Sequence, residues 1–146
     1  MSGMEGGCRC GASRYTLAVE GPPPVYCCHC RDCQTWSGSA FTEQAVVRAD
    51  ALSATGPIVE YSFHNPSGSL STQWLCGTCH ARLWNTNTAR PGLALIRAGT
   101  LDLSDTLEPR AHIWVKRKQP WIVIADDVPT FQESAPPGEF AAILLG

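Results

Sequence analysis

The sequence predicts an all-β fold of short antiparallel strands around one core. It contains 13 glycines and 11 prolines, and short apolar segments recur between them. Frequent Gly and Pro interrupt long helices, and many short strands separated by turn signals favour a sandwich or a pair of sheets. A chain of 146 residues with 44% apolar residues is large enough for one core, so we expect a single domain over residues 1–146.

The first expected strand, 14–20, has the clearest pattern. Tyr15, Leu17 and Val19 alternate with other residues, and the Gly-Pro-Pro-Pro at 21–24 ends the segment. The remaining expected strands follow in chain order at 40–48, 58–63, 70–75, 82–84, 93–98, 112–115 and 121–125. Residues 31–36 are expected to form one helical turn, and the pattern assigns no state to the tail after Gly138.

Charge and composition exclude several classes of protein. The net charge is -2, whereas a protein that binds nucleic acid normally carries a basic surface, so we expect no nucleic-acid partner. No run of 18 apolar residues suggests a membrane span, and the first residues lack the apolar stretch of a signal peptide. We therefore expect a cytoplasmic protein without a membrane partner, and the sequence leaves its oligomeric state open.

Seven of the eight cysteines fall into three groups. In a reducing compartment, grouped cysteines indicate metal binding or redox chemistry more often than structural disulfides. Two thiolates one or two residues apart can bind one metal ion, and zinc prefers a tetrahedron of such ligands. The groups follow the patterns C-x-C, C-x-C-x-x-C and C-x-x-C and comprise Cys8 and Cys10; Cys28, Cys30 and Cys33; and Cys76 and Cys79.

Ligand counting favours dividing the seven cysteines into four and three. The two outer groups would form a closed site of four thiolates, which is typical of structural zinc. The central group would form a second site with one open position, where chemistry can occur. The competing division joins the first two groups and leaves Cys76 and Cys79 alone, and a third interpretation is that all seven thiols only stabilise the fold.

The neighbours of these cysteines have less certain roles. Cys27 is expected to be a small buried residue, although a ligand role stays open. His29 could be a fourth ligand, a neighbour that supports the site or a proton carrier. His80 fits an exposed turn residue better than a ligand, and Trp36 could line a pocket. Arg110 and the basic residues 116–118 fit a solvated face better than an anion site.

With these residues in view, the chain resembles the glutathione-dependent formaldehyde-activating enzyme family, also called S-(hydroxymethyl)glutathione synthase-like proteins. Residues 6–15 look like the opening of the family, and 28–33 with 38–41 look like its central signature. The last resembling blocks lie at 76–79 with 83–84, at 98–102 and at 109–114. Together these blocks cover most of the chain.

The resemblance implies a β-tent, or Mss-four-like, zinc-binding fold. It implies one structural zinc on Cys8, Cys10, Cys76 and Cys79, and a second zinc on Cys28, Cys30 and Cys33. Because this second, catalytic ion has only three thiolate ligands that donate heavily to it, we expect it to be loosely held and partly occupied. The implied activity is that of a carbon–sulfur lyase that joins the thiol of glutathione reversibly to formaldehyde. We expect an incoming thiol to take the open position on the zinc held by the central cysteines, with His29 or water as the proton source.

The chain departs from the family at two points. His80 stands where the family often has glycine, and the chain is short beside the members that use glutathione, so a glutathione-binding loop could be missing. Because some relatives, such as centromere protein V, are not enzymes, two alternatives stay open. One is a non-catalytic interaction module with two structural zinc sites, and the other is a thiol redox protein.

Overall fold

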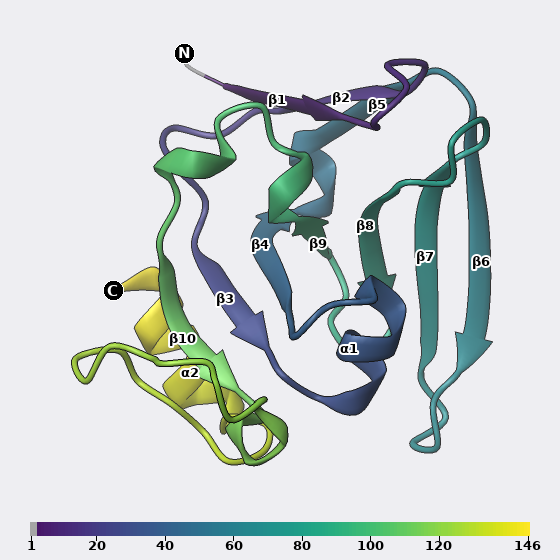
Figure 1. The fold of residues 1–146 in the computed structure, drawn as a ribbon. Helices are drawn as coiled ribbons and strands as arrows, with labels where there is room; N and C mark the ends of the chain where they lie inside the picture. Colours follow the sequence, from purple (N-terminus) through teal and green to yellow (C-terminus); the bar gives the residue numbers. More distant parts are fainter. Residues whose placement is uncertain (1–2) are drawn as a thin grey trace. The chain divides into compact units, whose positions relative to one another are not determined.

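The computed structural model of the protein describes residues 3–146, and the chain forms two compact units (Figure 1). The first unit comprises Met1–Pro23 and Ala45–Thr106, and the second comprises Pro24–Gln44 and Leu107–Gly146. Each unit is built from segments that are distant in the sequence. The expectation of a single domain over 1–146 stays a prediction.

The first unit contains a small three-stranded sheet in the order β1-β2-β5, with both pairs antiparallel. Its strands are β1 (Met4–Gly7), β2 (Arg14–Leu17) and β5 (Leu52–Thr55). Tyr15 and Leu17 of β2 are both buried, which matches the alternation in the sequence. Because Gly7 pairs with Arg14, residues 8–13 form the loop of a hairpin.

Four further strands of the first unit follow one another as antiparallel neighbours in the order β9-β8-β7-β6. They are β6 (Ile58–His64), β7 (Leu70–Cys76), β8 (Arg82–Asn87) and β9 (Leu93–Arg97). Trp74 and Trp84 lie opposite each other on β7 and β8, and their rings stack at 5.6 Å. Short 3₁₀ helices complete the unit: η1 (Ala49–Ala51), η2 (Ala98–Thr100) and η3 (Ser104–Thr106).

The second unit pairs its strands in parallel: β10 (Pro109–Ile113) lies beside β3 (Val25–Cys28), all of whose residues are buried. Parallel neighbours need a long connection, and these two strands are far apart in the sequence. The unit also contains α1 (Arg31–Ser37), η4 (Val115–Arg117) and α2 (Pro137–Leu145). Strand β4 (Thr42–Arg48) begins here and continues the chain into the first unit.

The all-β prediction is confirmed, with three differences in detail. The pair of β3 and β10 is parallel rather than antiparallel. Residues 121–125 form no strand; Pro120, which cannot donate a backbone hydrogen bond, precedes a loop in which Val123 is 91% exposed. The tail, which the sequence left unassigned, forms α2, and the ring of Phe140 packs edge-on against Tyr26 at 5.0 Å.

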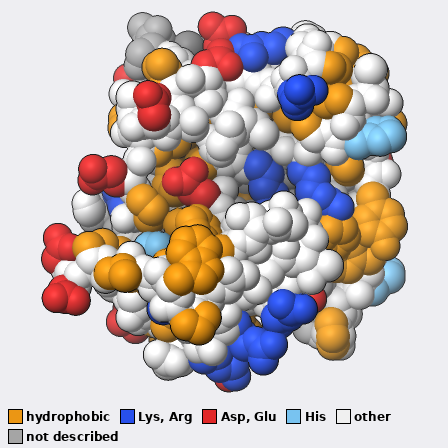
Figure 2. Space-filling view, viewed as in Figure 1, with side chains coloured by type: hydrophobic (Ala, Val, Ile, Leu, Met, Phe, Trp, Pro, Cys, Tyr) orange, Lys and Arg blue, Asp and Glu red, His pale blue; other side chains and the backbone are white. Residues whose placement is uncertain are grey.

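Apolar side chains also reach the surface, as Figure 2 shows for the face that it draws. The large exposed hydrophobic residues are Val59, Tyr61, Leu93, Leu103, Trp121, Val123 and Leu145. They come from several elements, and single exposed apolar residues are normal in proteins. Over residues 3–146, the helices are all too short or too polar to cross a bilayer.

Candidate metal centres and the adjacent pocket

The first unit brings four cysteines together from two hairpins. Cys8 and Cys10 lie in the loop between β1 and β2, while Cys76 ends β7 and Cys79 lies in the turn before β8. All four Sγ atoms lie within 4.8 Å of one another. The fold therefore brings together the two outer cysteine groups, as ligand counting favoured. Cys10 and Cys76 are 66 residues apart in the sequence.

The spacing of these sulfur atoms fits a shared metal ion. The Sγ atoms of Cys8 and Cys10 are 3.6 Å apart, and those of Cys10 and Cys76 are 3.9 Å apart. A tetrahedral zinc with Zn–S bonds of about 2.3 Å places its sulfurs about 3.8 Å apart, whereas a disulfide needs about 2.05 Å. All eight cysteines of the chain are free. The cluster could hold a metal ion, and its geometry is unsuited to disulfides.

Backbone N–H groups point at the sulfurs of this cluster. Ser13 N donates to Cys8 Sγ at 3.3 Å, and Thr78 N donates to Cys76 Sγ at the same distance. Hydrogen bonds from the Ser13 side chain and then from the backbone of Cys79 lower the pKa of Cys76 to about 5. Donors of this kind stabilise thiolates, which are the form that binds metal.

His80 follows the last of these cysteines and adopts a left-handed backbone conformation, with φ of 62°. Its backbone N–H donates to Cys76 O at 2.9 Å, which closes the turn around the sulfurs. Glycine adopts this conformation without the steric cost that a side chain brings. His80 is exposed and lies outside the group of sulfurs, so the turn-residue interpretation fits its position.

The second unit brings three cysteines together around the start of a helix. Cys28 ends β3, Cys30 is the N-cap of α1 and Cys33 lies in the first turn of that helix. Their Sγ atoms lie within 4.8 Å of one another, and Cys33 N donates to Cys30 Sγ at 3.3 Å. Cys28 is buried, whereas Cys30 and Cys33 are half-buried. This three-sulfur cluster could also hold a metal ion.

The three thiols strongly influence one another. Hydrogen bonds from the thiols of Cys28 and Cys33 lower the pKa of Cys30 to about 2, and the hydrogen bond with Cys30 raises the pKa of Cys28. One negative charge is therefore well stabilised among the three sulfurs, while a second and third charge repel it. A cation at the centre of the group removes that repulsion, which is a further way in which this donor set suits a metal.

His29 lies between two of these cysteines in the sequence but faces a different environment. It is fully buried, its Nε2 lies 2.9 Å from His112 Nδ1, and its ring packs 5.1 Å from that of Phe41. Its Nδ1 has no hydrogen-bond partner among the described residues. Burial, followed by the charges of His112 and Lys118, lowers the pKa of His29 to about 4. Proton delivery by His29 stays a prediction, and His112 stands between its Nε2 and any acceptor on that side.

The structure also places three other residues near the site or its supporting strands. Cys27 is buried and belongs to neither cluster, and burial raises the pKa of its thiol to about 12, as suits a small core residue. The Nδ1 atom of His112 lies 2.9 Å from His29 Nε2, a pairing that the sequence pattern did not indicate. Arg110 donates to Leu144 O and so ties β10 to the C-terminal helix.

A cavity of about 460 Å³ lies in the second unit, and none of the three cysteines is among its lining residues. Helix α1, which contains Cys33, forms one side of it, and Gln119 and Trp121 form the other. Trp36, which the sequence suggested as a lining residue, does not line it. The lining residues are Arg31, Gln34, Thr35, Gly38, Ser39, Ala40, Gln119 and Trp121.

Side-chain amides hold the two sides of this cavity together. Gln34 Nε2 donates to His29 O at 2.8 Å and to Arg117 O at 2.9 Å. Its Oε1 accepts from Arg31 Nη1 at 3.4 Å and from Gln119 Nε2 at 3.5 Å. Because Gln34 is buried and bonded on both ends of its amide, it fixes α1 against the segment that follows η4.

A model of the glutathione-dependent formaldehyde-activating enzyme family matches residues 3–117. The chain belongs to this family. The match spans both cysteine clusters and ends just before Gln119 and Trp121 of the cavity. It confirms the resemblance that the cysteine blocks suggested.

Two curated proteins share this similarity. A protein of Halomonas elongata named "Putative glutathione-dependent formaldehyde-activating enzyme" is 28% identical over 127 residues, which cover 83% of this chain and 80% of that protein. An uncharacterized lyase of Schizosaccharomyces pombe is 27% identical over 84 residues, or 58% of each protein. These names connect the family to formaldehyde activation and to lyase chemistry.

A crystal structure of a Rhodobacter sphaeroides protein has a similar fold, with a TM-score of 0.55 and 20% sequence identity. The similarity covers 73% of this chain and 93% of the other. At this level of identity it supports the fold and says nothing about a substrate.

Proposed function

We propose that this family member is a zinc-dependent carbon–sulfur lyase that adds a thiol, glutathione or a similar molecule, reversibly to formaldehyde or another small aldehyde. The observation that supports this most is the difference between the two cysteine clusters. One has four sulfurs, and the other has three, of which Cys30 and Cys33 are only half-buried. A closed four-ligand site is typical of structural zinc, and a three-ligand site is typical of catalytic zinc.

In this proposal, each cluster has its own task. A structural zinc would be held by Cys8, Cys10, Cys76 and Cys79, and a second zinc by Cys28, Cys30 and Cys33. When bound in the second cluster, zinc lowers the pKa of a coordinated thiol, whose free value is roughly 8.5, so that the reactive thiolate exists at neutral pH.

The chain itself would position the reactants. Cys28 is held by a buried strand and Cys30 by the N–H of Cys33, so the sulfurs keep their arrangement without a ligand. Because Cys30 and Cys33 are only half-buried, an incoming thiol could reach the three-sulfur cluster. The reaction begins from this bound thiol. Its sulfur forms a bond to the aldehyde carbon, the C=O double bond becomes a hydroxyl, and one proton moves from the thiol to that oxygen. Nothing is oxidised or reduced, and we propose His29 or water as the proton donor.

Replacing Cys30 tests the proposal. We expect Cys30→Ser to lower the rate of adduct formation at least 100-fold, since it removes a ligand of the proposed open site while sparing the four-sulfur cluster. Because thiols and formaldehyde also combine without an enzyme, the rate should be measured by NMR exchange between free and bound glutathione, with the uncatalysed rate subtracted.

Metal analysis accompanies this measurement. The unmodified chain should contain two zinc ions and the variant one. Cys27→Ser serves as the matched control, because Cys27 precedes Cys28 but belongs to neither cluster. Full activity in Cys30→Ser would contradict the proposed role of the three-sulfur cluster. A cytoplasmic location, expected from the sequence, stays a prediction.

A further inference from the structure

We propose that strand β6 is a docking edge for the same strand of a second copy of this chain, so that two first units join through one continuous antiparallel sheet. Three features of Ile58–His64 support this: backbone groups that point away from β7, an exposed apolar row, and a residue order that suits pairing with itself. The strand lies within the first unit, and its pairing does not depend on lyase activity.

The backbone of β6 has one side without a neighbouring strand. β6 is the last strand in the order β9-β8-β7-β6 (Figure 1). At one end of the strand Gly77 N donates to Pro57 O, and at the other Asn65 N donates to Ser69 O. Because the register between these points is regular, the odd-numbered residues of β6 bond to β7. The backbone groups that point away from β7 belong to the even-numbered residues Ile58, Glu60, Ser62 and His64.

These outward groups are not covered by another part of the chain. Within residues 3–146, no backbone hydrogen bond joins the four even-numbered residues to a segment beyond β7. The edge of β1 differs, because Asp102 N donates to Glu5 O, and the edge of β10 is covered by the segment at 129–133. Edge strands are often protected by Pro, Lys or a bulge, and Ile58–His64 has none of these. A regular edge of seven residues is therefore suited to pairing with another strand.

One face of β6 carries an exposed apolar row beside this edge. Val59, Tyr61 and Phe63 alternate along the strand and so lie on the same face. Val59 and Tyr61 are 47% and 54% exposed, and the rings of Tyr61 and Phe63 are 5.8 Å apart. A second strand added at the edge would bury part of this apolar area while it bonds to the backbone.

The order of the residues favours a second copy as the partner. In a twofold antiparallel pair centred on Tyr61, the even-numbered residues face one another, so every outward backbone group of the strand is used. Tyr61 then lies opposite its own copy, and Val59 lies opposite the partner's Phe63. Aromatic and β-branched pairs of this kind stabilise sheets.

The single charged residue of the strand agrees with this register. Glu60 lies opposite the partner's Ser62, so like charges do not face each other. A twofold pair centred on Glu60 would place two carboxylates opposite each other, which is unfavourable. A pair centred on Ser62 would leave Ile58 without a facing residue in the strand. The register centred on Tyr61 is thus the one that pairs the whole strand without repulsion.

The oligomeric state tests the proposal. The protein is used as purified, with any bound metal, in a reducing buffer that prevents intermolecular disulfides. We expect sedimentation velocity to show a weak, concentration-dependent dimer, because one strand edge and one row of side chains make a small interface. Glu60→Pro should abolish the dimer, since proline removes an outward N–H that the monomer does not need at an edge. Glu60→Gln keeps this N–H and is the matched control, which should dimerise like the unmodified chain.

Charge exchange tests the register without proline. Ser62→Glu places two carboxylates opposite each other twice in each dimer and should raise the dissociation constant about tenfold. Adding Glu60→Lys to the same chain turns both contacts into Lys–Glu pairs and should restore the affinity. Glu60→Lys alone should have little effect, because it faces the partner's Ser62. Ser62→Gln is the control for the loss of the hydroxyl contact between Ser62 and Thr72.

Each outcome decides for or against the pairing. A monomer at every concentration would overturn it, and so would a dimer that survives Glu60→Pro, since the copies would then meet elsewhere. A loss of affinity in Ser62→Glu that Glu60→Lys does not recover would overturn the twofold pair centred on Tyr61. Recovery would support the pair, because a substitution that only damaged the fold would not be repaired from the facing strand.

Discussion

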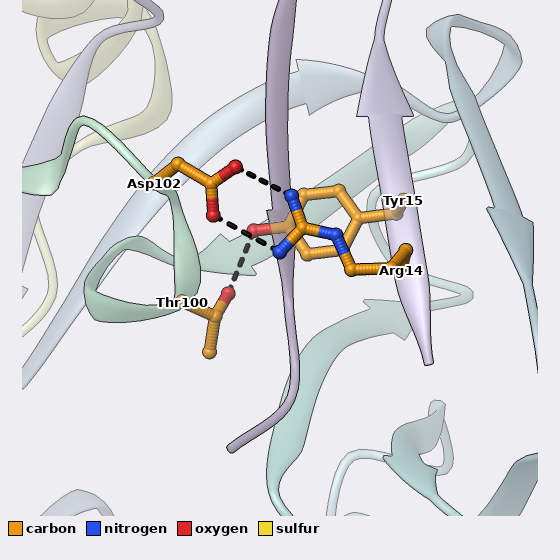
Figure 3. A network of polar contacts seen from close by, with 4 residues as sticks. All are labelled: Arg14, Tyr15, Thr100 and Asp102. Atoms are coloured by element: carbon orange, nitrogen blue, oxygen red, sulfur yellow. Dashed lines mark hydrogen bonds and ion pairs between the residues drawn. The ribbon is translucent and has the colours of Figure 1, made fainter. Parts of the chain in front are cut away.

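Tyr15 shows at the scale of one residue how a polar group is accommodated in the core of the first unit. Its ring is buried and packs 6.3 Å from that of Trp84, while its hydroxyl is 2.7 Å from Thr100 Oγ1 (Figure 3). Arg14, which precedes Tyr15 in β2, pairs with Asp102 through two hydrogen bonds. The two contacts hold β2 against η2 and the residues that follow it.

These two contacts differ in how much they contribute to the stability of the fold. The side chains of Arg14 and Asp102 are 42% and 48% exposed, and exposed ion pairs typically contribute only 0.2–1 kcal/mol. The hydroxyl of Tyr15 is shielded from water, and burial raises its pKa to about 12. The phenol therefore stays neutral in the folded protein at a pH where it ionises in the unfolded chain.

The shift of Tyr15 predicts a loss of stability in alkali. The unfolded phenol titrates near 10 and the folded one near 12, so the unfolded chain binds fewer protons in this window and stability falls as the pH rises through it. We expect the loss to approach about 2 kcal/mol at pH 12. Urea unfolding at pH 9 to 11.5 measures the slope. Tyr15→Phe should flatten it, and an unchanged slope in that variant would contradict the assignment.

At the scale of elements, the hairpin of β1 and β2 explains why the sequence did not reveal β1. Its residues, Met4–Gly7, include two glycines and show no apolar alternation. The glycine at position 6 is needed for space, because a Cβ there would lie 2.4 Å from the Tyr15 hydroxyl and 2.5 Å from Thr100 O. The sequence of this strand thus reflects the close approach of two backbone segments and not an alternation of apolar side chains.

We predict that Gly6→Ala destabilises the protein by about 1–3 kcal/mol, the usual cost of inserting atoms into a packed site. The backbone oxygen of Thr100 cannot move aside as a flexible side chain could. Thermal unfolding measures the change. Gly99→Ala is the control, because a Cβ at Gly99 meets no atom within 4 Å and should alter stability little. Equal stability of both variants would show that β1 is less tightly packed than described.

Helix α1 contributes both to the three-sulfur cluster and to the lining of the cavity. It begins at a cysteine N-cap, contains a second cysteine, and ends at Gly38, whose φ of 63° suits glycine. The sequence predicted a helical turn at 31–36, close to the observed Arg31–Ser37. It gave no indication that Gln119 and Trp121 lie beside this helix, and the expected strand at 121–125 would have placed Trp121 in a sheet.

At the scale of the whole molecule, the two cysteine clusters lie in different units. The four-sulfur cluster joins two hairpins of the first unit, whereas the three-sulfur cluster lies within six consecutive residues of the second. If both bind zinc as proposed, loss of the first ion removes a cross-link between distant segments. Loss of the second leaves the local backbone connections in place.

Metal removal should therefore occur in two stages. With increasing chelator, we expect the first zinc to leave with little change in the thermal midpoint, since it comes from the three-sulfur cluster, which offers one protein ligand fewer. Removal of the second should lower the midpoint by more than about 10 °C, because structural zinc contributes several kcal/mol to folding. Metal content and thermal unfolding are followed together. In Cys30→Ser the first stage should vanish, and a large drop in midpoint during that first stage would contradict the assignment of the clusters.

The sequence by itself determined the β-rich class, the family and the grouping of the cysteines, because sulfur spacing and strand alternation are local properties. Only the tertiary structure decided which residues meet from distant segments: the pair of His29 and His112, the parallel neighbours β3 and β10, and the cavity between α1 and Trp121. Such contacts depend on how buried surfaces pack, and packing leaves no periodic trace in a single sequence. Arg31 illustrates the difference, since the sequence shows only that it follows Cys30, whereas the fold places it in the lining of a pocket.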